Sequence, residues 1–373
     1  AGTITGLGNE AVTLSGSTSV ADANSVDGST SGVITATISE TNITSLSGLS
    51  GTGNAYTISV ADASVDAAAL NILDGKTTVT VNAASVGTLT GTATAIDTAI
   101  NASSIDTGAA VVVNVSSGSV TVAQANSIDA QTTGVVTATI SQGDLATLGS
   151  LTGTGNAYTI TLSDSTAAAS ALNTLDGKTT VAVNAGTVMT LTGTAADVNA
   201  AYTSNTAGTI TGLGDEAVTL SGSTSVADAN SVDGSTSGVI TATISDTAMS
   251  TLGGLSGTGN AYTISVADAS VDAAALNTLD GKTTVTVNAA SVGTLTGTAG
   301  DIVTAISAAT IDTGSAVVAT VTGSATVAQA NTIDTNTTGV VTATITETTI
   351  SALSGLNSSI GNAYTISVAD ASV

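Results

Sequence analysis

The tetrapeptide Gly-Asn-Ala-Tyr occurs four times in this chain, beginning at Gly53, Gly155, Gly259 and Gly361. The successive spacings are 102, 104 and 102 residues. Self-similarity at a fixed period is the sequence signature of a repeat protein. The 373 residues therefore hold about 3.6 copies of a module of about 102 residues. We predict one continuous domain over residues 1–373, with approximate module phases 1–102, 103–206, 207–308 and 309–373.

A shorter period inside each module indicates the fold. Strand-like runs begin at intervals of 21 to 25 residues, with one interval of 32. In residues 33–39 apolar and polar side chains alternate, so that Ile34 and Ile38 are predicted to face a core while Thr35 and Thr37 face solvent. One coil of a parallel β-solenoid fits this period. It would consist of a strand, a bend, a second strand and a helical or turn-like third side. We therefore predict an all-β fold, a parallel β-solenoid with coils of about 22–24 residues. An α/β-type solenoid and a row of stacked β-sandwich modules remain as alternatives.

Two further features accompany this prediction. Ala-rich inserts at residues 92–102, 194–202 and 298–306 carry helical spacing and capping signals, so we expect short surface helices there. Residues 1–91 align without gaps to residues 207–297 and differ at eight positions, six of them between Glu40 and Ser47. This clustering predicts an exposed turn in which substitutions cost little.

The composition excludes most chemistry. The chain has no His, Cys, Pro or Arg, and its three Lys face 27 Asp and Glu, for a net charge of −24. Without His or Cys there is no Ser-His-Asp or Cys-His system and no zinc finger, so we predict that the chain is not an enzyme. Three cations cannot neutralise a phosphate backbone, which argues against nucleic-acid binding. The apolar runs are far shorter than the roughly 20 residues of a spanning helix, so we predict no membrane insertion.

Outward Thr-x-Thr pairs are the first candidate site. If such pairs stack in register they form a flat face that could contact ice, a mineral or a neighbouring copy, whereas the simpler interpretation is that Thr is soluble and favours strands. The predicted face consists of Thr35, Thr37, Thr78, Thr80, Thr137 and Thr139.

The repeated pattern Asn-x-apolar-Asp is the second candidate. Asn and Asp side chains hold turns by bonding nearby amides, so we predict a turn at each copy. In the first module and the start of the second the polar residues are Asn24, Asp27, Asn71, Asp74, Asn126 and Asp129. Stacked carboxylates would repel, and calcium is a hard cation that could bridge them. The calcium candidates are Asp27, Asp74, Asp106 and Asp129. The Gly-Gly-x-Gly-x-Asp signature of calcium-binding β-rolls is absent, so turn-capping aspartates are the simpler interpretation, and no other cofactor is expected.

The sequence stops within a module at Val373, and neither of its ends has the pattern of a polar capping coil. We expect residues 1–373 to be a window on a longer rod, with a subunit that stacks end to end as the alternative. The expected partner is the protein itself, through axial continuation or through head-to-tail and lateral filament contacts.

A family resemblance points the same way. Leu-Asn-Thr-Leu-Asp-Gly-Lys-Thr-Thr-Val (276–285), Leu-Thr-Gly-Thr-Ala-Ala-Asp-Val-Asn-Ala-Ala-Tyr (191–202) and Ile-Thr-Gly-Leu-Gly-Asp-Glu-Ala-Val-Thr-Leu (210–220) resemble repeat tracts of very large secreted surface proteins of marine cyanobacteria. This resemblance covers the whole chain and implies an extracellular structural or adhesive role with no catalytic residue. We therefore expect a structural repeat protein that forms a stiff filament or cell-surface rod. The alternative is an adhesin or an ice- or mineral-binding solenoid that uses the Thr-rich face.

Overall fold

The computed structural model describes residues 8–357 and 361–370. The chain folds as two compact units, which we describe one at a time. Unit 1 comprises Ala1–Asp164, Ala171–Thr187 and Ser204–Gly212, and unit 2 comprises Ser165–Ser170, Val188–Thr203 and Leu213–Val373.

Unit 1 is built on parallel sheets. A three-stranded sheet has the order β1-β2-β3, with β1 (Val12–Thr18), β2 (Ile34–Ile38) and β3 (Ala55–Thr57). A five-stranded sheet has the order β10-β9-β8-β6-β4, with β4 (Ser64–Asp66), β6 (Thr88–Thr92), β8 (Val112–Ser117), β9 (Val136–Thr139) and β10 (Ala157–Thr159). Two further pairs are β5 (Val81–Asn82) with β7 (Ile105–Asp106) and β12 (Val183–Asn184) with β14 (Ile210–Thr211).

Unit 2 is also built on parallel sheets. Its first five-stranded sheet has the order β11-β13-β15-β16-β17, with β11 (Thr166–Ala168), β13 (Thr190–Gly193), β15 (Ala217–Thr224), β16 (Ile240–Ile244) and β17 (Ala261–Thr263). Its second has the order β18-β20-β22-β23-β24, with β18 (Ser270–Asp272), β20 (Thr294–Gly297), β22 (Val318–Ala325), β23 (Val341–Ile345) and β24 (Ala363–Thr365). β19 (Val287–Asn288) pairs with β21 (Ile311–Asp312). Every strand pair in both units is parallel, as between Val218 of β15 and Ile240 of β16.

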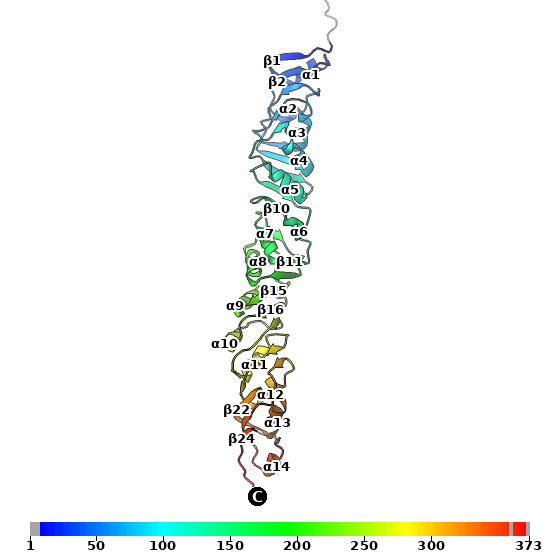
Figure 1. Cartoon of the computed structure of the whole chain (residues 1–373). Helices are drawn as coiled ribbons and strands as arrows, with labels where there is room; N and C mark the ends of the chain where they lie inside the picture. The colour runs from blue at the N-terminus through cyan, green and yellow to red at the C-terminus, as the bar shows by residue number, and fades with distance from the viewer. Residues whose placement is uncertain (1–7, 358–360, 371–373) are drawn as a thin grey trace, which may run out of the picture. The chain divides into compact units, whose positions relative to one another are not determined.

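The prediction of an all-β parallel β-solenoid is wrong, because helices separate the parallel strands throughout the described part of the chain (Figure 1). The fold is mixed α/β: 14 helices alternate with 24 strands in residues 8–357 and 361–370. The helices of unit 1 are α1 (Val20–Asp27), α2 (Ile43–Leu46), α3 (Ala67–Asp74), α4 (Ala93–Asn101), α5 (Val122–Asp129) and α6 (Leu145–Leu148). Those of unit 2 are α9 (Val226–Asp233), α10 (Met249–Leu252), α11 (Ala273–Asp280), α12 (Ala299–Ser307), α13 (Val327–Asn336) and α14 (Ile350–Leu353). Helices α7 (Ala169–Asp176) and α8 (Ala195–Ala207) contain residues of both units.

Local chemistry explains the helices. The hydroxyl of Ser19 accepts a hydrogen bond from the Asp22 amide and so caps α1, and Thr121 forms a reciprocal capping box with Gln124 at the start of α5. Such caps satisfy amide groups that a helix leaves without partners in its first turn. The three predicted helical inserts are present as α4, α8 and α12, and Thr92 and Thr298 cap two of them.

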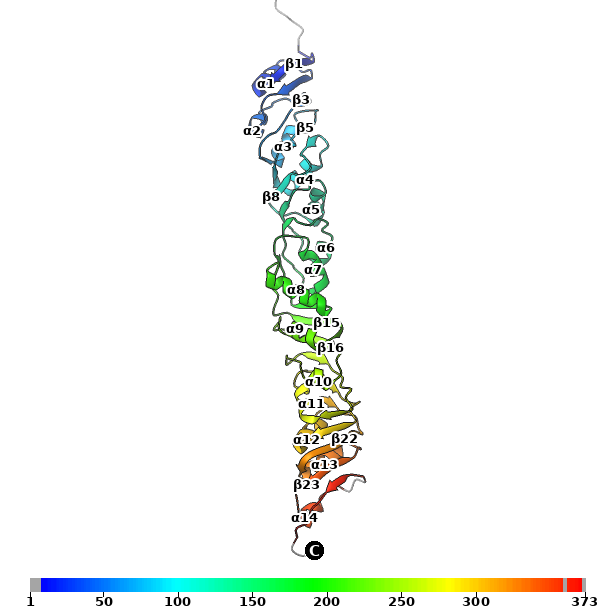
Figure 2. The same ribbon diagram turned by 90° about the vertical axis from the view of Figure 1, so that its left-hand side faces the viewer.

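The strands confirm the predicted alternation. In β2 Ile34, Ala36 and Ile38 are buried while Thr35 and Thr37 are exposed. Helices contribute the opposite wall, since Leu70 and Leu73 of α3 are also buried. Within unit 2 consecutive helices lie side by side, α11 against α12 and α12 against α13, as both views show (Figures 1 and 2). The core therefore forms between a strand layer and a helix layer, with small Ala, Val, Ile and Leu side chains filling a narrow space.

The segment with most differences between modules 1 and 3 is a helix rather than the predicted exposed turn. Helix α2 spans Ile43–Leu46 and buries Leu46. The corresponding helices are α6 and α10, whose N-cap residues are Asp144 and Ala248. Asp144 accepts a hydrogen bond from the Thr147 amide, whereas Ala248 provides no side-chain cap.

This difference predicts that Ala248→Asp stabilises the protein. The new carboxylate should accept the Thr251 amide as Asp144 accepts Thr147, and a cap of this kind contributes about 1 kcal/mol. The change is measured as the free energy of unfolding in urea. The matched reverse variant, Asp144→Ala, should lose a similar amount; equal stability of both variants and the wild type would contradict the assignment of these caps.

Candidate functional site: the aspartate–asparagine junctions

The repeated Asn-x-apolar-Asp pattern forms the last turn of a helix rather than a separate turn. It ends α1, α3, α5, α7, α9 and α11, where Asp is the final helical residue in each case. In α13 the same pattern is followed by two more helical residues. The polar side chains of the pattern therefore project from helix ends.

The Asn of this pattern bonds to the main chain of the next repeat. Asn24 Nδ2 donates to Gly48 O at 2.7 Å, and Asn24 Oδ1 accepts from Ser50 N at 2.9 Å. The same pair of bonds occurs at Asn126 with Ser150 and Thr152, at Asn230 with Gly254 and Ser256, and at Asn331 with Gly355 and Asn357. One amide side chain thus satisfies both a carbonyl and an N–H group, 24 and 26 residues further along the chain.

The Asp of the pattern bonds to a second Asn, which belongs to Gly-Asn-Ala-Tyr. Asn54 Nδ2 donates to Asp27 Oδ1 at 2.9 Å, and Asn54 Oδ1 accepts from the amide of Ile34 at the start of β2, also at 2.9 Å. Asn54 is only 3% exposed. Each of these aspartate–asparagine junctions therefore connects a helix end, a strand start and the following repeat. The junctions are Asp27–Asn54, Asp129–Asn156, Asp233–Asn260 and Asp334–Asn362.

Glycine makes room for the junction. A Cβ atom on Gly257 would lie 2.3 Å from Asp233 Oδ1 and 2.5 Å from Asn260 Nδ2. Gly51 and Gly153 stand in the same position over their own junctions. Any side chain there would separate the carboxylate from the amide.

A tyrosine ring packs beneath each junction. Tyr56, Tyr158 and Tyr262 are fully buried. Burial, followed by the negative charge of Asp233, raises the pKa of Tyr262 to about 12. The same two causes raise the pKa of Tyr56, Tyr158 and Tyr364, with Asp27, Asp129 and Asp334 as the respective charges. The hydroxyls of Tyr56, Tyr158 and Tyr262 are therefore core groups that resist ionisation at alkaline pH.

The aspartates that end α3 and α11 have different partners. Asp74 Oδ2 accepts from Ser104 Oγ at 2.8 Å, and Asp280 Oδ2 accepts from Thr310 Oγ1 at 2.8 Å. The nearby lysines reach main-chain oxygen instead: Lys76 Nζ lies 3.5 Å from Ser50 O.

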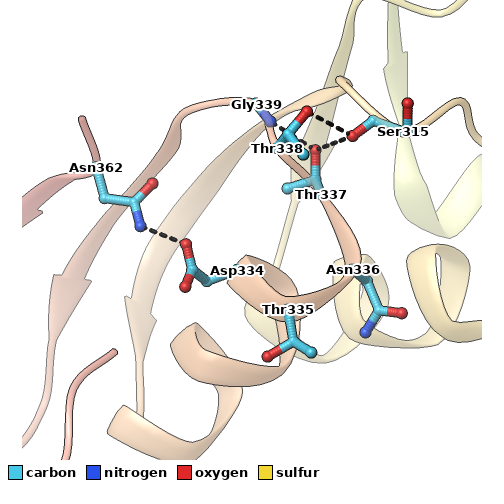
Figure 3. A pocket seen from close by; sticks show the side chains of 8 residues that line it. All are labelled: Ser315, Asp334, Thr335, Asn336, Thr337, Thr338, Gly339 and Asn362. Atoms are coloured by element: carbon cyan, nitrogen blue, oxygen red, sulfur yellow. Dashed lines mark hydrogen bonds between the residues drawn. The ribbon is translucent and has the colours of Figure 1, made fainter. Parts of the chain in front are cut away.

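A polar cleft lies beside the junction at Asp334 (Figure 3). It has a volume of about 410 Å³ and is lined by Ser315, Asp334, Thr335, Asn336, Thr337, Thr338, Gly339 and Asn362. Both carboxylate oxygens of Asp334 accept hydrogen bonds, from Asn362 Nδ2 at 2.6 Å and from Asn357 Nδ2 at 3.2 Å. Thr337 and Thr338 donate to main-chain carbonyls of Val317 and Ser315. The cleft therefore offers hydroxyl and amide groups that are already engaged in holding repeats together.

The four calcium candidates come from two kinds of element. Asp27, Asp74 and Asp129 end helices, whereas Asp106 lies on β7 and accepts a bond from the Gly108 amide. Within the described ranges no three acidic side chains gather in a way that could hold a metal ion.

The six threonines of the predicted face are also divided. Thr35 and Thr37 lie exposed on β2, and Thr137 and Thr139 lie exposed on β9 of a different sheet. Thr78 and Thr80 lie in the loop between α3 and β5. The hydroxyl and amide of Thr78 both bond to Asn54 O. The six threonines thus come from two sheets and a loop that parallel bridges connect to the β3 segment, and their forming one face stays a prediction.

The residues that the sequence left unassigned are the junction asparagines and a set of threonines. Thr30 Oγ1 donates to Glu10 O at 2.8 Å, and Thr77 Oγ1 donates to Tyr56 O at 2.7 Å, each joining one repeat to the preceding one. The signal that could have identified these threonines is positional: Thr-x-Gly recurs in all four modules, and Lys-Thr-Thr recurs in the first three.

No protein-family model, no curated protein and no solved structure matches this chain. Among the helices in the described ranges, none has the length and hydrophobicity required to cross a membrane.

Loss of one junction should destabilise the fold measurably. In Asn156→Leu the Val136 amide and the Asp129 carboxylate lose buried partners at 2.8 and 2.7 Å. Leaving such groups unsatisfied costs about 2–4 kcal/mol in the free energy of unfolding, measured in urea. Asn114→Ala, on the exposed side of β8, is the control and should change stability by no more than about 0.5 kcal/mol. Equal effects of the two variants would show that the junction contributes little.

The tyrosines predict loss of stability at alkaline pH. An unfolded tyrosine ionises near pH 10, whereas the pKa of folded Tyr262 is raised to about 12. Between these values the unfolded chain releases protons that the folded chain retains, so stability is intact below pH 10 and falls as the pH rises toward 12. Ultraviolet titration of tyrosinate should therefore show ionisation coinciding with loss of circular dichroism. An ionisation near pH 10 in the folded protein would contradict the burial of these rings.

Proposed function

We propose that this chain is an extracellular structural repeat protein that assembles with copies of itself into a filament or a cell-surface rod. The observation that carries the proposal is the use made of the polar side chains in its most repeated motifs. In the Asn-x-apolar-Asp pattern, the Asn side chain bonds to the main chain of the next repeat, as Asn24 does. The Asp carboxylate bonds to a junction asparagine, as Asp27 does to Asn54. The polar side chains of these motifs are thus occupied in connecting repeats.

Charge supports an extracellular, saline setting for this function. With a net charge of −24, copies of the chain repel one another in dilute buffer. At an ionic strength near that of sea water the screening length is only a few Å, so that short-range contacts can dominate. The absence of Cys makes such a scaffold independent of the redox state of its surroundings.

The alternative of an ice- or mineral-binding protein receives less support. It depends on exposed threonines alone, such as Thr35 and Thr37 on β2, whereas the structural role rests on hydrogen bonds that recur from repeat to repeat. The structural role is therefore the one we propose.

The test is the assembly state of the purified chain as salt concentration rises. We expect sedimentation to show association that increases with salt and protein concentration, and electron microscopy to show uniform fibres at the highest concentrations. Asn230→Leu, which removes one bond pair between repeats, should weaken the fold and the fibres together. A chain that remains monomeric under all of these conditions would contradict the proposal.

A further inference from the structure

The charged residues of this protein are excluded from most of its strands. Of the 24 strands in the described ranges, only β4, β7, β18 and β21 contain a charged residue, a single Asp in each case. In a chain with 30 charged residues, 27 of them acidic and three basic, this distribution leaves sheet surfaces that carry no charge.

The clearest such surface belongs to the sheet β11-β13-β15-β16-β17 of unit 2, in which no strand contains a charged residue. Its outward side chains stand in register across the sheet: Thr219 lies opposite Thr241, Ser223 opposite Thr243, and Thr243 opposite Thr263. We call this surface the uncharged face and define it by Thr192, Thr219, Ser223, Thr241, Thr243 and Thr263.

The uncharged face is accessible and partly apolar. Thr219, Thr241, Thr243 and Thr263 are exposed, and each presents a methyl group beside its hydroxyl. Val239, immediately before β16, is 51% exposed. In parallel sheets neighbouring strands lie about 4.8 Å apart, so the face is a regular array of small side chains.

The carboxylates of the same region lie on the helix side and at strand ends. Asp228 and Asp233 belong to α9. Asp228 bonds to the N-cap Ser225 in the first turn, and Asp233 forms a junction with Asn260 at the last. Asp246 follows β16 and accepts the Val226 amide at the start of α9. A contact through the helix side would bring like charges together, whereas a contact through the uncharged face would not.

We propose that the uncharged face is the lateral contact between copies of this chain, each copy packing this sheet against the same sheet of another. The inference rests on the proposed function and names the surface that produces side-by-side association. Its physical basis is charge: for a chain of net charge −24, the favourable partner for a surface without carboxylates is an identical surface. Face-to-face packing of two sheets places them about 10 Å apart and buries Thr methyl groups and Val239.

The experiment adds charge to the face of the whole chain and measures association by sedimentation at high salt. In Thr219→Glu/Thr241→Glu the new carboxylates would be buried against those of the partner copy. A like-charge contact of this kind costs several kcal/mol, so association should weaken by at least about a hundredfold. The matched control, Ala227→Glu/Ala274→Glu, adds the same charge on the exposed sides of α9 and α11 and should change association by less than about threefold.

A second measurement locates the contact directly. Because the chain has no Cys, Thr241→Cys and Ala227→Cys each introduce a single thiol. Maleimide labelling of the Thr241→Cys thiol should slow by at least about tenfold when the chain associates, since a buried thiol reacts only from the dissociated fraction. Labelling of the Ala227→Cys thiol should not slow.

The outcomes separate this inference from the proposed function. Fibres that form equally well with Thr219→Glu/Thr241→Glu, and leave the Thr241→Cys thiol reactive, would overturn the uncharged face as the contact while preserving the structural role. Face-dependent dimers without fibres would support the face and contradict the filament. A monomeric chain with thermal hysteresis activity that Thr219→Val/Thr241→Val abolishes would overturn both, because the hydroxyl array would then bind ice rather than another copy.

Discussion

Hydrogen bonding of the main chain from one repeat to the next is the constraint on which the rest of this structure depends. Parallel strands supply it where they pair, as Thr241 does with Ala261. The strands in the described ranges have only two to eight residues each, so many amide and carbonyl groups lie beyond the ladders. Buried main-chain groups must find partners. Asn24, Asn54 and Thr77 provide such partners from one repeat to another.

This requirement explains an unusual composition. The fold needs small apolar side chains for a narrow core, and short polar side chains that reach a neighbouring main chain without filling space. Ala, Val, Ile and Leu meet the first need, and Asn, Asp, Ser and Thr meet the second. Proline would remove a donor from the ladders, and the chain has none. Large aromatic residues appear only as the five tyrosines, of which Tyr202 donates a hydrogen bond to the buried Glu216.

The sequence predicted the strand faces well and the helices poorly. The alternation of Ile34, Thr35 and Ala36 is enough to predict which side chains of β2 are buried and which are exposed, because it depends only on neighbouring residues. Helix α1, by contrast, has eight residues rich in Asn, Ser and Asp, which are weak helix formers. Ser19 and Asp22 form a helix cap of the same kind as the capping signals that identified the Ala-rich inserts. The cap directly follows the strand-like residues of β1, so the start of a helix there was not recognised. The junction at Asn54 was beyond prediction because its partner Asp27 lies a whole repeat earlier, with no local pattern to connect them.

Differences between the modules show which atoms the fold requires. Shortly after β2, β9, β16 and β23 a side chain accepts the first amide of the preceding helix: Glu40 bonds to Val20, Gln142 to Val122, Asp246 to Val226 and Glu347 to Val327. The residue type changes while the acceptor oxygen remains. The α2 segment, which the sequence comparison presented as a freely substituted turn, is therefore constrained at the level of hydrogen bonding. Where Ala248 removes one cap from α10, the carboxylate of Asp268 in the next repeat still accepts the Met249 amide. The same bond joins Asp62 to the Ile43 amide and Asp164 to the Leu145 amide, where the caps are present. The bond between repeats is thus retained whether or not the cap within the repeat is, as expected of a scaffold that depends on its repeat-to-repeat bonds.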